Sequence, residues 1–167
     1  MQTLQLSNIY LDWIGYLGPL ITMLLNISAL WFQTPYLLGY IAFLVMNSMV
    51  NKAIKNIVKE PRPTNQVDIE TMHIFNLGGI KDIYGMPSGH AQSIAFSMSY
   101  LYFIQKDLYT VLLYTSILGL TVFQRWNYKK HTIKQLIVGI VIGILFGFFS
   151  YQIIKHSLED AERDTIL

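Results

Sequence analysis

The 167-residue sequence contains no cysteine and few charged residues, and these two shortages narrow the possible functions. Without cysteine the chain can form no disulfide, no cysteine-ligated zinc site and no thiolate nucleophile. Charged residues make up 13% of the chain and hydrophobic residues 53%, whereas soluble domains average about 25% charged residues. The composition therefore predicts a membrane protein, and a net charge of +2 is too small to suggest a nucleic-acid partner.

The few charges are distributed unevenly. No lysine or arginine precedes Lys52, so we expect no basic region of a cleaved signal peptide. No charge of either sign lies between Asp12 and Lys52, and the polar segment at residues 33–35 divides this run in two. Together with three later apolar runs, the two halves predict five membrane-spanning helices, because a bilayer needs about 20 residues per helix. The predicted spans are residues 13–32, 36–51, 83–104, 108–124 and 135–154.

We therefore predict one all-α domain over residues 1–167, an integral membrane, multi-pass helical bundle with its active site at one membrane face. Residues 1–12 are too short to span and are expected to lie in the membrane interface. The polar tail, residues 157–167, is expected to be disordered. Three glycines recur at four-residue spacing in the last span: Gly139, Gly143 and Gly147. This spacing predicts close packing against another helix.

Five spans place most of the positive charge on one membrane face. Nine of the twelve lysines and arginines lie there: Lys52, Lys55, Lys59, Arg62, Lys81, Arg125, Lys129, Lys130 and Lys134. The positive-inside rule would make this face cytoplasmic. Lys55, Arg62 and Arg125, however, have a second use in the motifs that follow, and without them the bias is weak. The sequence leaves the orientation open.

The segment Tyr-Gly-Met-Pro-Ser-Gly-His at residues 84–90 opens the third predicted span. Pro87 suits the first turn of a helix, where a missing N–H is tolerated. Ser88 and Gly89 would then present free backbone N–H groups at the helix N-terminus, which bind anions. His90 adds a proton donor. The segment predicts an anion site with a titratable group at the membrane boundary.

A basic cluster lies at the end of the second predicted span. Lys55 and Lys59 fall on one face of the expected helix. Pro61 and Pro63 then hold Arg62 in an extended turn. A basic membrane anchor is one interpretation, and we prefer it for Lys59. An arginine between two prolines instead favours a bound anion, because arginine makes bidentate contacts with phosphate.

Another basic cluster, residues 124–135, joins the fourth and fifth predicted spans. Arg125 closes the fourth span and His131 precedes the fifth. Trp126 and Tyr128 also fit an interfacial loop with aromatic anchors, and that interpretation suffices for the lysines of this loop. A functional role for His131 is favoured by the two other segments, which are predicted to lie on the same membrane face.

Together the three segments resemble the signature motifs of the type 2 phosphatidic acid phosphatase family. The first is Lys55, six residues and Arg62-Pro63, the second is Pro-Ser-Gly-His at residues 87–90, and the third is Arg125, five residues and His131. The resemblance covers residues 55–135, and the order and spacing fit. The wider superfamily includes vanadium-dependent haloperoxidases, an activity that suits five apolar spans poorly.

The resemblance implies an integral membrane phosphatase that works without a metal ion or another cofactor. His131 would be the nucleophile that forms a phosphohistidine, and His90 would be the general acid and base. The groups that would hold the phosphoryl oxygens are Lys55, Arg62, Ser88, Gly89 and Arg125. Three cations would then take the electrostatic role of a metal.

The substrate implied by the resemblance is a lipid phosphate or diphosphate. The candidates are a polyprenyl diphosphate, phosphatidic acid and phosphatidylglycerol phosphate. Similarity of residues 84–90 to polyprenyl diphosphate phosphatases favours the first. Residues 64–86 are long enough to cover the site. Residues 72–75 could contact the lipid chains, and ordinary loop packing explains this apolar segment equally well.

Two departures from the family pattern bear on activity. Members commonly have six spans, and we predict five. The third motif usually ends with an acid four residues after the histidine, and here that residue is Gln135. We expect Gln135 to accept the ring N–H of His131, so that an acid introduced there raises kcat; Asp82 is the next candidate for this orienting role. The alternative function is a weak or inactive relative that binds phosphorylated lipid.

Overall fold

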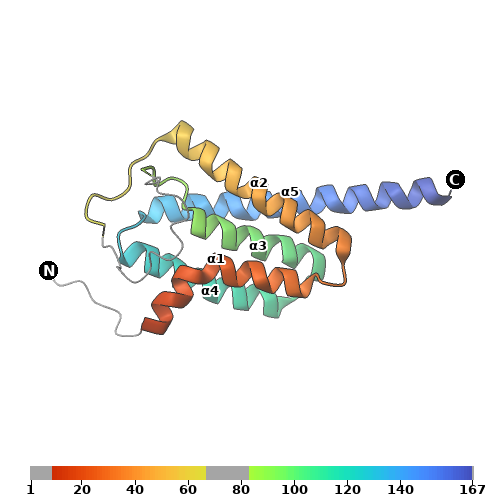
Figure 1. The fold of residues 1–167 in the computed structure, drawn as a ribbon, viewed down its shortest axis with the longest axis horizontal. Helices are drawn as coiled ribbons and strands as arrows, with labels where there is room; N and C mark the ends of the chain where they lie inside the picture. The colour runs from red at the N-terminus through yellow and green to blue at the C-terminus, as the bar shows by residue number, and fades with distance from the viewer. Residues whose placement is uncertain (1–8, 67–82, 167) are drawn as a thin grey trace.

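The computed structural model describes residues 9–66 and 83–166, and these residues form five α-helices and no β-strand. The helices are α1 (Ile9–Ala29), α2 (Thr34–Val58), α3 (Gly89–Gln105), α4 (Leu108–Asn127) and α5 (Ile133–Ile166). They form one bundle in which α3 packs against each of the other four, most extensively against α5 (Figure 1). The all-α bundle predicted from the sequence is confirmed. Of the segment expected in the membrane interface, residues 1–8 lie outside the described part.

Local sequence explains where several helices begin and end. Pro35 lies in the first turn of α2, where its missing N–H is tolerated. The carboxylate of Asp107 caps α4 by accepting two backbone N–H groups of the first turn, at 3.3 and 2.9 Å. α2 and α3 both end at a lysine in the left-handed conformation, Lys59 with φ 51° and Lys106 with φ 54°.

α3 and α5 approach closely because glycines of α5 face α3. A Cβ atom added to Gly139 would lie 2.6 Å from the carbonyl oxygen of Ser88, and one added to Gly147 would lie 2.7 Å from that of Phe96. Gly143 meets the backbone of α3 in the same way. A side chain at any of these positions would push the two helices apart. The close packing predicted from the glycine spacing is confirmed.

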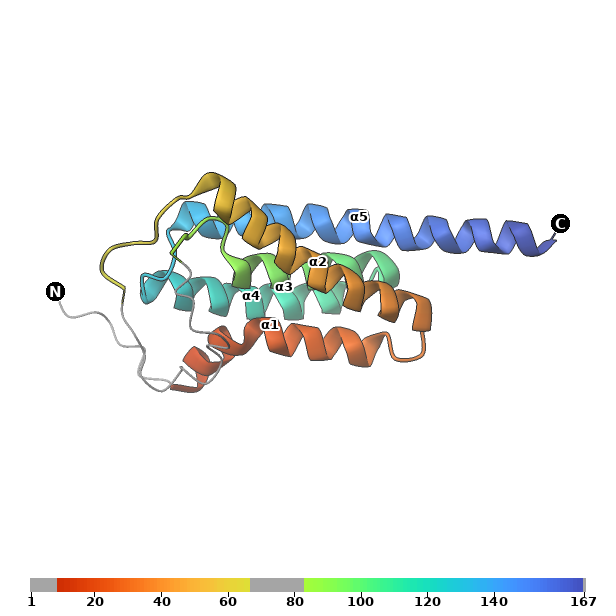
Figure 2. The same cartoon turned by 45° about the horizontal axis from the view of Figure 1, so that its top comes forward.

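α5 continues well beyond the rest of the bundle (Figures 1 and 2). Along this extension Lys155 pairs with Glu159 at 3.5 Å and Arg163 pairs with Asp160 at 3.8 Å, each one turn apart. Such pairs favour a helix, and the tail contains no glycine or proline to interrupt it. The expectation that residues 157–167 are disordered is therefore wrong, because α5 includes all but the last of them.

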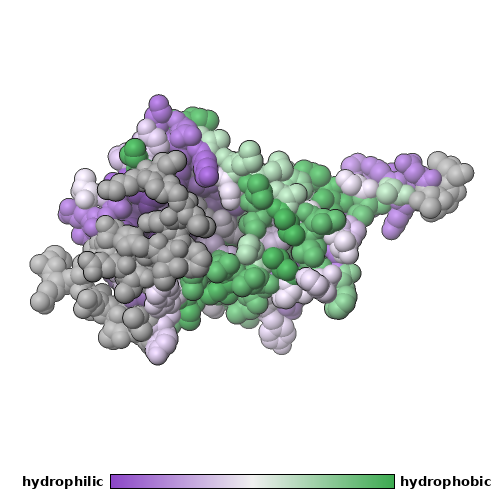
Figure 3. All heavy atoms as spheres, in the orientation of Figure 1, coloured by the Kyte–Doolittle hydropathy of each residue, from purple (hydrophilic) through white to green (hydrophobic). Residues whose placement is uncertain are grey.

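The surface of the bundle is that of a membrane protein. Large hydrophobic side chains are exposed on its helices, among them Leu24, Val45, Leu112 and Leu145. They contribute to a hydrophobic band between a polar end of the bundle and the polar extension of α5 (Figure 3). Within the described residues, α2 and residues 133–164 of α5 are long and apolar enough to cross a membrane. That all five helices span it stays a prediction.

Candidate active site

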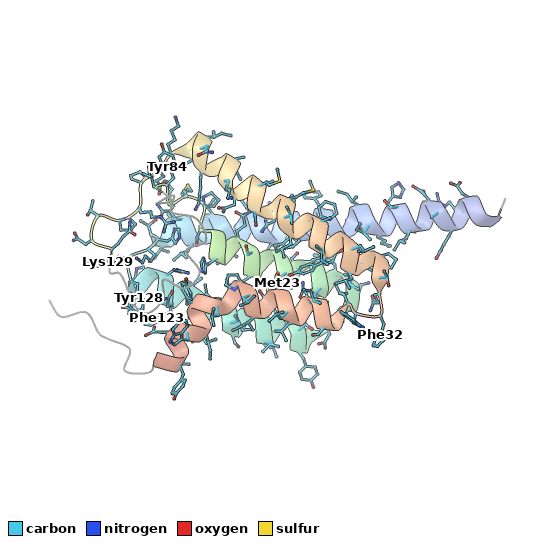
Figure 4. All side chains as sticks on the ribbon, in the orientation of Figure 1. Met23, Phe32, Tyr84, Phe123, Tyr128 and Lys129 are labelled. Carbon is cyan, nitrogen blue, oxygen red and sulfur yellow. The ribbon has the colours of Figure 1, made fainter. Side chains whose placement is uncertain are left out.

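The three motif segments meet at one end of the bundle, where α2 ends, α3 begins and a short loop joins α4 to α5 (Figure 1). Tyr84, just before α3, lies at this end together with Tyr128 and Lys129 from the loop after α4 (Figure 4). Phe32, between α1 and α2, lies at the opposite end. The chain thus gathers its candidate site residues on one face, as the predicted topology requires.

Backbone hydrogen bonds join the three segments. The N–H of Gly85 donates to the carbonyl oxygen of Glu60 at 2.8 Å, and Tyr84 forms an isolated antiparallel bridge with Pro61. The N–H of Ser88 donates to the carbonyl oxygen at the third motif's end, 3.0 Å away. The second motif is therefore held between the first and the third.

Two expectations for the start of α3 are wrong. Pro87 precedes the helix instead of occupying its first turn, because the residues before it run beside the first motif and Ser88 is the N-cap. The N–H of Ser88 is not free for an anion, because it donates to Gln135. Gly89 and the two residues after it still have N–H groups without an acceptor inside the helix. The Ser88 hydroxyl is buried and has no hydrogen-bond partner among the described residues.

His131 lies in the loop before α5 and is 4% exposed. Its Nδ1 lies 2.9 Å from the carbonyl oxygen of Gly85. A carbonyl can only accept, so Nδ1 carries the proton and Nε2 carries the lone pair. Burial, followed by the charges of Arg62, Arg125 and Lys55, lowers the pKa of His131 from 6.5 to about 3. The ring is therefore neutral, and able to act as a nucleophile, at neutral pH.

This lowered pKa predicts an unusual pH dependence for chemical modification of His131. Diethyl pyrocarbonate acylates only the neutral imidazole, and with a pKa of about 3 the neutral fraction hardly changes between pH 7 and pH 5. In an ordinary histidine, with a pKa of about 6.5, it falls roughly 25-fold over this range. We expect the modification rate of His131, measured by peptide mass spectrometry, to fall less than twofold. A histidine peptide in the same solution is the control, and a parallel 25-fold fall would contradict the assignment.

His90 and Arg125 are in direct contact. An Nη atom of Arg125 hydrogen-bonds to Nε2 of His90, and since arginine only donates, Nε2 is the acceptor. His90 also makes a hydrogen bond with the backbone of Tyr16. The Tyr16 ring lies under the guanidinium of Arg125, 5.1 Å from its central carbon, and 6.0 Å from the His90 ring. This cation–π geometry fixes Arg125 beside the imidazole.

The sequence reasoning missed the contribution of α1 to the site. Pro19 lies inside α1 and has no N–H, so the carbonyl of Gly15 lacks its helical donor. The hydroxyl of Thr121 in α4 donates to this carbonyl at 2.8 Å. This hydrogen bond joins α4 to α1 at Gly15, the residue that precedes Tyr16. A proline within a predicted span was the available signal, because it frees a carbonyl for a neighbouring helix.

The cations expected to bind phosphate lie around the two histidines. Lys55 and Arg125 are 6% and 8% exposed, and Arg62 donates to the carbonyl oxygen of Lys130 at 3.4 Å. Nε of Arg125 is buried without a partner in the part of the chain that the structure describes. Within residues 9–66 and 83–166, no three His, Asp or Glu residues come together as metal ligands. The charge of the site suits an anion, and metal independence stays a prediction.

Gln135 does not accept the ring N–H of His131, so the direct hydrogen bond expected between them is wrong. Its side-chain oxygen accepts the N–H of Thr132 at 3.1 Å. Its NH₂ group donates to a carboxylate oxygen of Glu60 at 3.0 Å and to the carbonyl of Pro61 at 2.9 Å. The side chain points toward the first motif, and the Gly85 carbonyl takes the imidazole N–H instead. Asp82, the second candidate for this role, lies outside the described residues, as do residues 72–75.

Fold and site together define a helical membrane bundle with two histidines among three cations at one end. Residues 36–159 match the family model of the PAP2 superfamily, and the chain belongs to this superfamily. The matched region begins in α2, so α1 with its Tyr16 contact lies outside it.

Named relatives agree with this membership. The chain is 33% identical over 127 residues to a dolichyldiphosphatase of Saccharomyces cerevisiae, covering 67% of this chain and 50% of that one. It is 27% identical over 124 residues to dolichyldiphosphatase 1 of Dictyostelium discoideum, covering 68% and 50%. A chloroplastic lipid phosphate phosphatase epsilon 1 of Arabidopsis thaliana is 28% identical over 131 residues, covering 74% and 42%. The chain thus spans about half the length of these relatives.

A solved structure supports the fold. The crystal structure of a transmembrane PAP2 type phosphatidylglycerolphosphate phosphatase from Bacillus subtilis matches with a TM-score of 0.66. The match covers 93% of this chain and 80% of that one, at 18% sequence identity. At this identity the likeness concerns the fold alone.

Proposed function

We propose that this protein is an integral membrane phosphatase that hydrolyses a lipid phosphate or diphosphate through a phosphohistidine on His131. One observation carries the proposal. The His131 ring is buried and neutral, its Nδ1 proton is held by the Gly85 carbonyl, and the charges of Lys55, Arg62 and Arg125 act on it. A neutral imidazole among three cations can attack an electrophile that is itself an anion, and a phosphoryl group is such an electrophile.

Substrate binding would use the donors around the two histidines. The oxygens of the phosphoryl group would accept from Lys55, Arg62 and Arg125, and from the first N–H of α3 at Gly89. The Ser88 hydroxyl and Nε of Arg125 are buried donors that the described residues do not satisfy, and an anion would satisfy both. When Arg125 turns to the anion, Nε2 of His90 becomes free to carry a proton.

In the first step, Nε2 of His131 attacks phosphorus while the bond to the leaving oxygen breaks. His90, protonated at Nε2, gives its proton to that oxygen. The Gly85 carbonyl keeps the Nδ1 proton in place, and so stabilises the positive charge that develops on the ring. In the second step, His90 takes a proton from a water molecule that attacks the phosphohistidine. The P–N bond breaks, inorganic phosphate leaves and both histidines return to their starting states.

A lipid substrate follows from where the site lies. It sits at the polar end of a bundle whose middle is hydrophobic, which corresponds to headgroup depth if the helices cross the membrane (Figure 3). We further propose that all five helices span the bilayer. The similarity to two dolichyldiphosphatases, at 33% and 27% identity, favours a polyprenyl diphosphate over phosphatidic acid and phosphatidylglycerol phosphate.

We expect the purified protein to release phosphate from a polyprenyl diphosphate without an added metal ion. The proposed phosphate ligands are three cations and backbone amides, so excess chelator should change the rate less than twofold. Vanadate, which forms a five-coordinate analogue of the phosphoryl transition state, should inhibit. The measurement is phosphate release in detergent from the three candidate substrates. Loss of activity in chelator that magnesium restores would contradict the mechanism. Binding of these lipids without turnover would favour the alternative, a lipid-phosphate-binding protein.

A further inference from the structure

We propose that Glu60 and Gln135 form a positioning pair for His131, in which the Glu60 carboxylate fixes the Gln135 amide that packs against Gly85. The pair would act through Gly85, by holding its carbonyl against Nδ1 of the imidazole. The inference rests on the proposed function and assigns two further residues to the same site.

Glu60 holds Gly85 through the backbone. The carbonyl oxygen of Glu60 accepts the N–H of Gly85 at 2.8 Å. The carbonyl oxygen of Gly85 in turn accepts Nδ1–H of His131 at 2.9 Å. Gly85 therefore lies between the first motif and the imidazole, and a rotation of its carbonyl would break the bond that fixes the tautomer of His131.

Gln135 holds Gly85 by packing. The Gln135 side chain is fully buried, at 0% exposure, and lies against the Cα atom of Gly85. A Cβ atom added to Gly85 would be 2.6 Å from the side-chain nitrogen of Gln135 and 2.7 Å from Cδ. Because the amide packs against the Cα side of Gly85, it limits how far the backbone at this glycine can move. The same residue accepts the Ser88 N–H through its backbone and the Thr132 N–H through its side chain. Gln135 therefore contacts all three motifs.

Glu60 fixes the orientation of the Gln135 amide. Both hydrogens of the NH₂ group go to acceptors, the Glu60 carboxylate at 3.0 Å and the Pro61 carbonyl at 2.9 Å. The amide oxygen is then turned toward the N–H of Thr132. The other carboxylate oxygen of Glu60 pairs with the exposed Lys134 at 3.2 Å. An acid at position 135 would face a carboxylate and a carbonyl with no proton to donate. The structure thus reverses the expectation from sequence that an acid there raises kcat.

The test is an exchange of the two side chains. Gln135→Glu keeps the shape of the residue but removes both donors and sets two carboxylates together, so we expect kcat to fall about 10- to 100-fold with KM within threefold. Adding Glu60→Gln to this variant restores a donor facing the new carboxylate, and we expect at least a fivefold recovery of kcat. Lys134→Gln is the matched control. It removes only the exposed ion pair of Glu60, and should change kcat less than twofold.

A second readout does not depend on turnover. The ¹⁵N chemical shifts of His131 should report a single tautomer with the proton on Nδ1 in the parent, and a mixture of tautomers in Gln135→Glu. If the parent is active but Gln135→Glu keeps its kcat and the tautomer is unchanged, the positioning pair is wrong and the proposed function stands. Failure of the double variant to recover would also overturn the pair. If the parent shows no turnover at all, the proposed function fails. The positioning pair is then tested by the ¹⁵N shifts alone, and an unchanged tautomer in Gln135→Glu would overturn it.

Discussion

Replacing His131 with alanine is expected to lower kcat by about 10⁴- to 10⁶-fold, as the loss of a nucleophile does in other hydrolases that form covalent intermediates. In the structure, Nε2 of His90 accepts a hydrogen bond from Arg125, whereas Nε2 of His131 carries the lone pair that would attack phosphorus. The three cations remain in the variant, so KM should change little. The measurement is single turnover with a ³²P-labelled substrate, in which the parent, but not the variant, should carry acid-labile label.

Two further variants make this result interpretable. His131→Asn has an amide that can still donate to the Gly85 carbonyl, so its loss of activity would report the missing nucleophile rather than a misfolded loop. His156→Ala, on the extension of α5 with 73% of its side chain exposed, should match the parent. Turnover by His131→Ala within tenfold of the parent, or label that survives the substitution, would assign the nucleophile to another residue.

The sequence was sufficient for the features that depend on local composition and order. Runs without charge predicted five helices, although not their bounds, and the spacing of three glycines in α5 predicted a close helix contact. The motif residues came together because each lies near or beyond a helix end on the same face of the bundle; they are Lys55, Arg62, His90, Arg125 and His131. Side-chain chemistry and topology can both be inferred from the sequence, and the resemblance to the family motifs supplied the roles expected for these residues.

The orienting groups could not be predicted in the same way. Both histidines are held by backbone, His131 by the carbonyl of Gly85 and His90 by that of Tyr16. Every residue has a carbonyl, so the sequence carries no signal for which one serves. The prediction for Gln135 failed because one turn of helix brings a side chain within reach of a ring but does not decide where it points. Its amide met two acceptors at the end of α2, and these determined its orientation.

Removing the guanidinium of Arg125 is expected to produce the second largest effect, a fall in kcat/KM of about 10³-fold. Arg125 contacts His90, rests on the Tyr16 ring and contributes to lowering the pKa of His131. Arg125→Ala therefore loses a ligand of the phosphoryl group together with the group that holds His90 in place. Both kcat and KM should change, unlike the result for His131→Ala. The measurement is the initial rate over a range of lipid concentrations in mixed micelles.

The kcat/KM of Arg125→Lys should exceed that of Arg125→Ala by at most about tenfold. An ammonium cannot donate to an anion in a planar fork while stacking on Tyr16. The variants also test the electrostatics without substrate. Since the charge of Arg125 helps to lower the pKa of His131, its removal should raise that pKa in Arg125→Ala above the value in the parent and in Arg125→Lys, measured by NMR titration of the His131 ring. Lys52→Ala, an exposed cation on α2, is the control and should leave kcat/KM and the His131 pKa unchanged. An Arg125→Ala variant with kcat/KM within fivefold of the parent and the same His131 pKa would remove Arg125 from the site. Neither a contact of Arg125 with the phosphoryl group nor its charge would then be acting there.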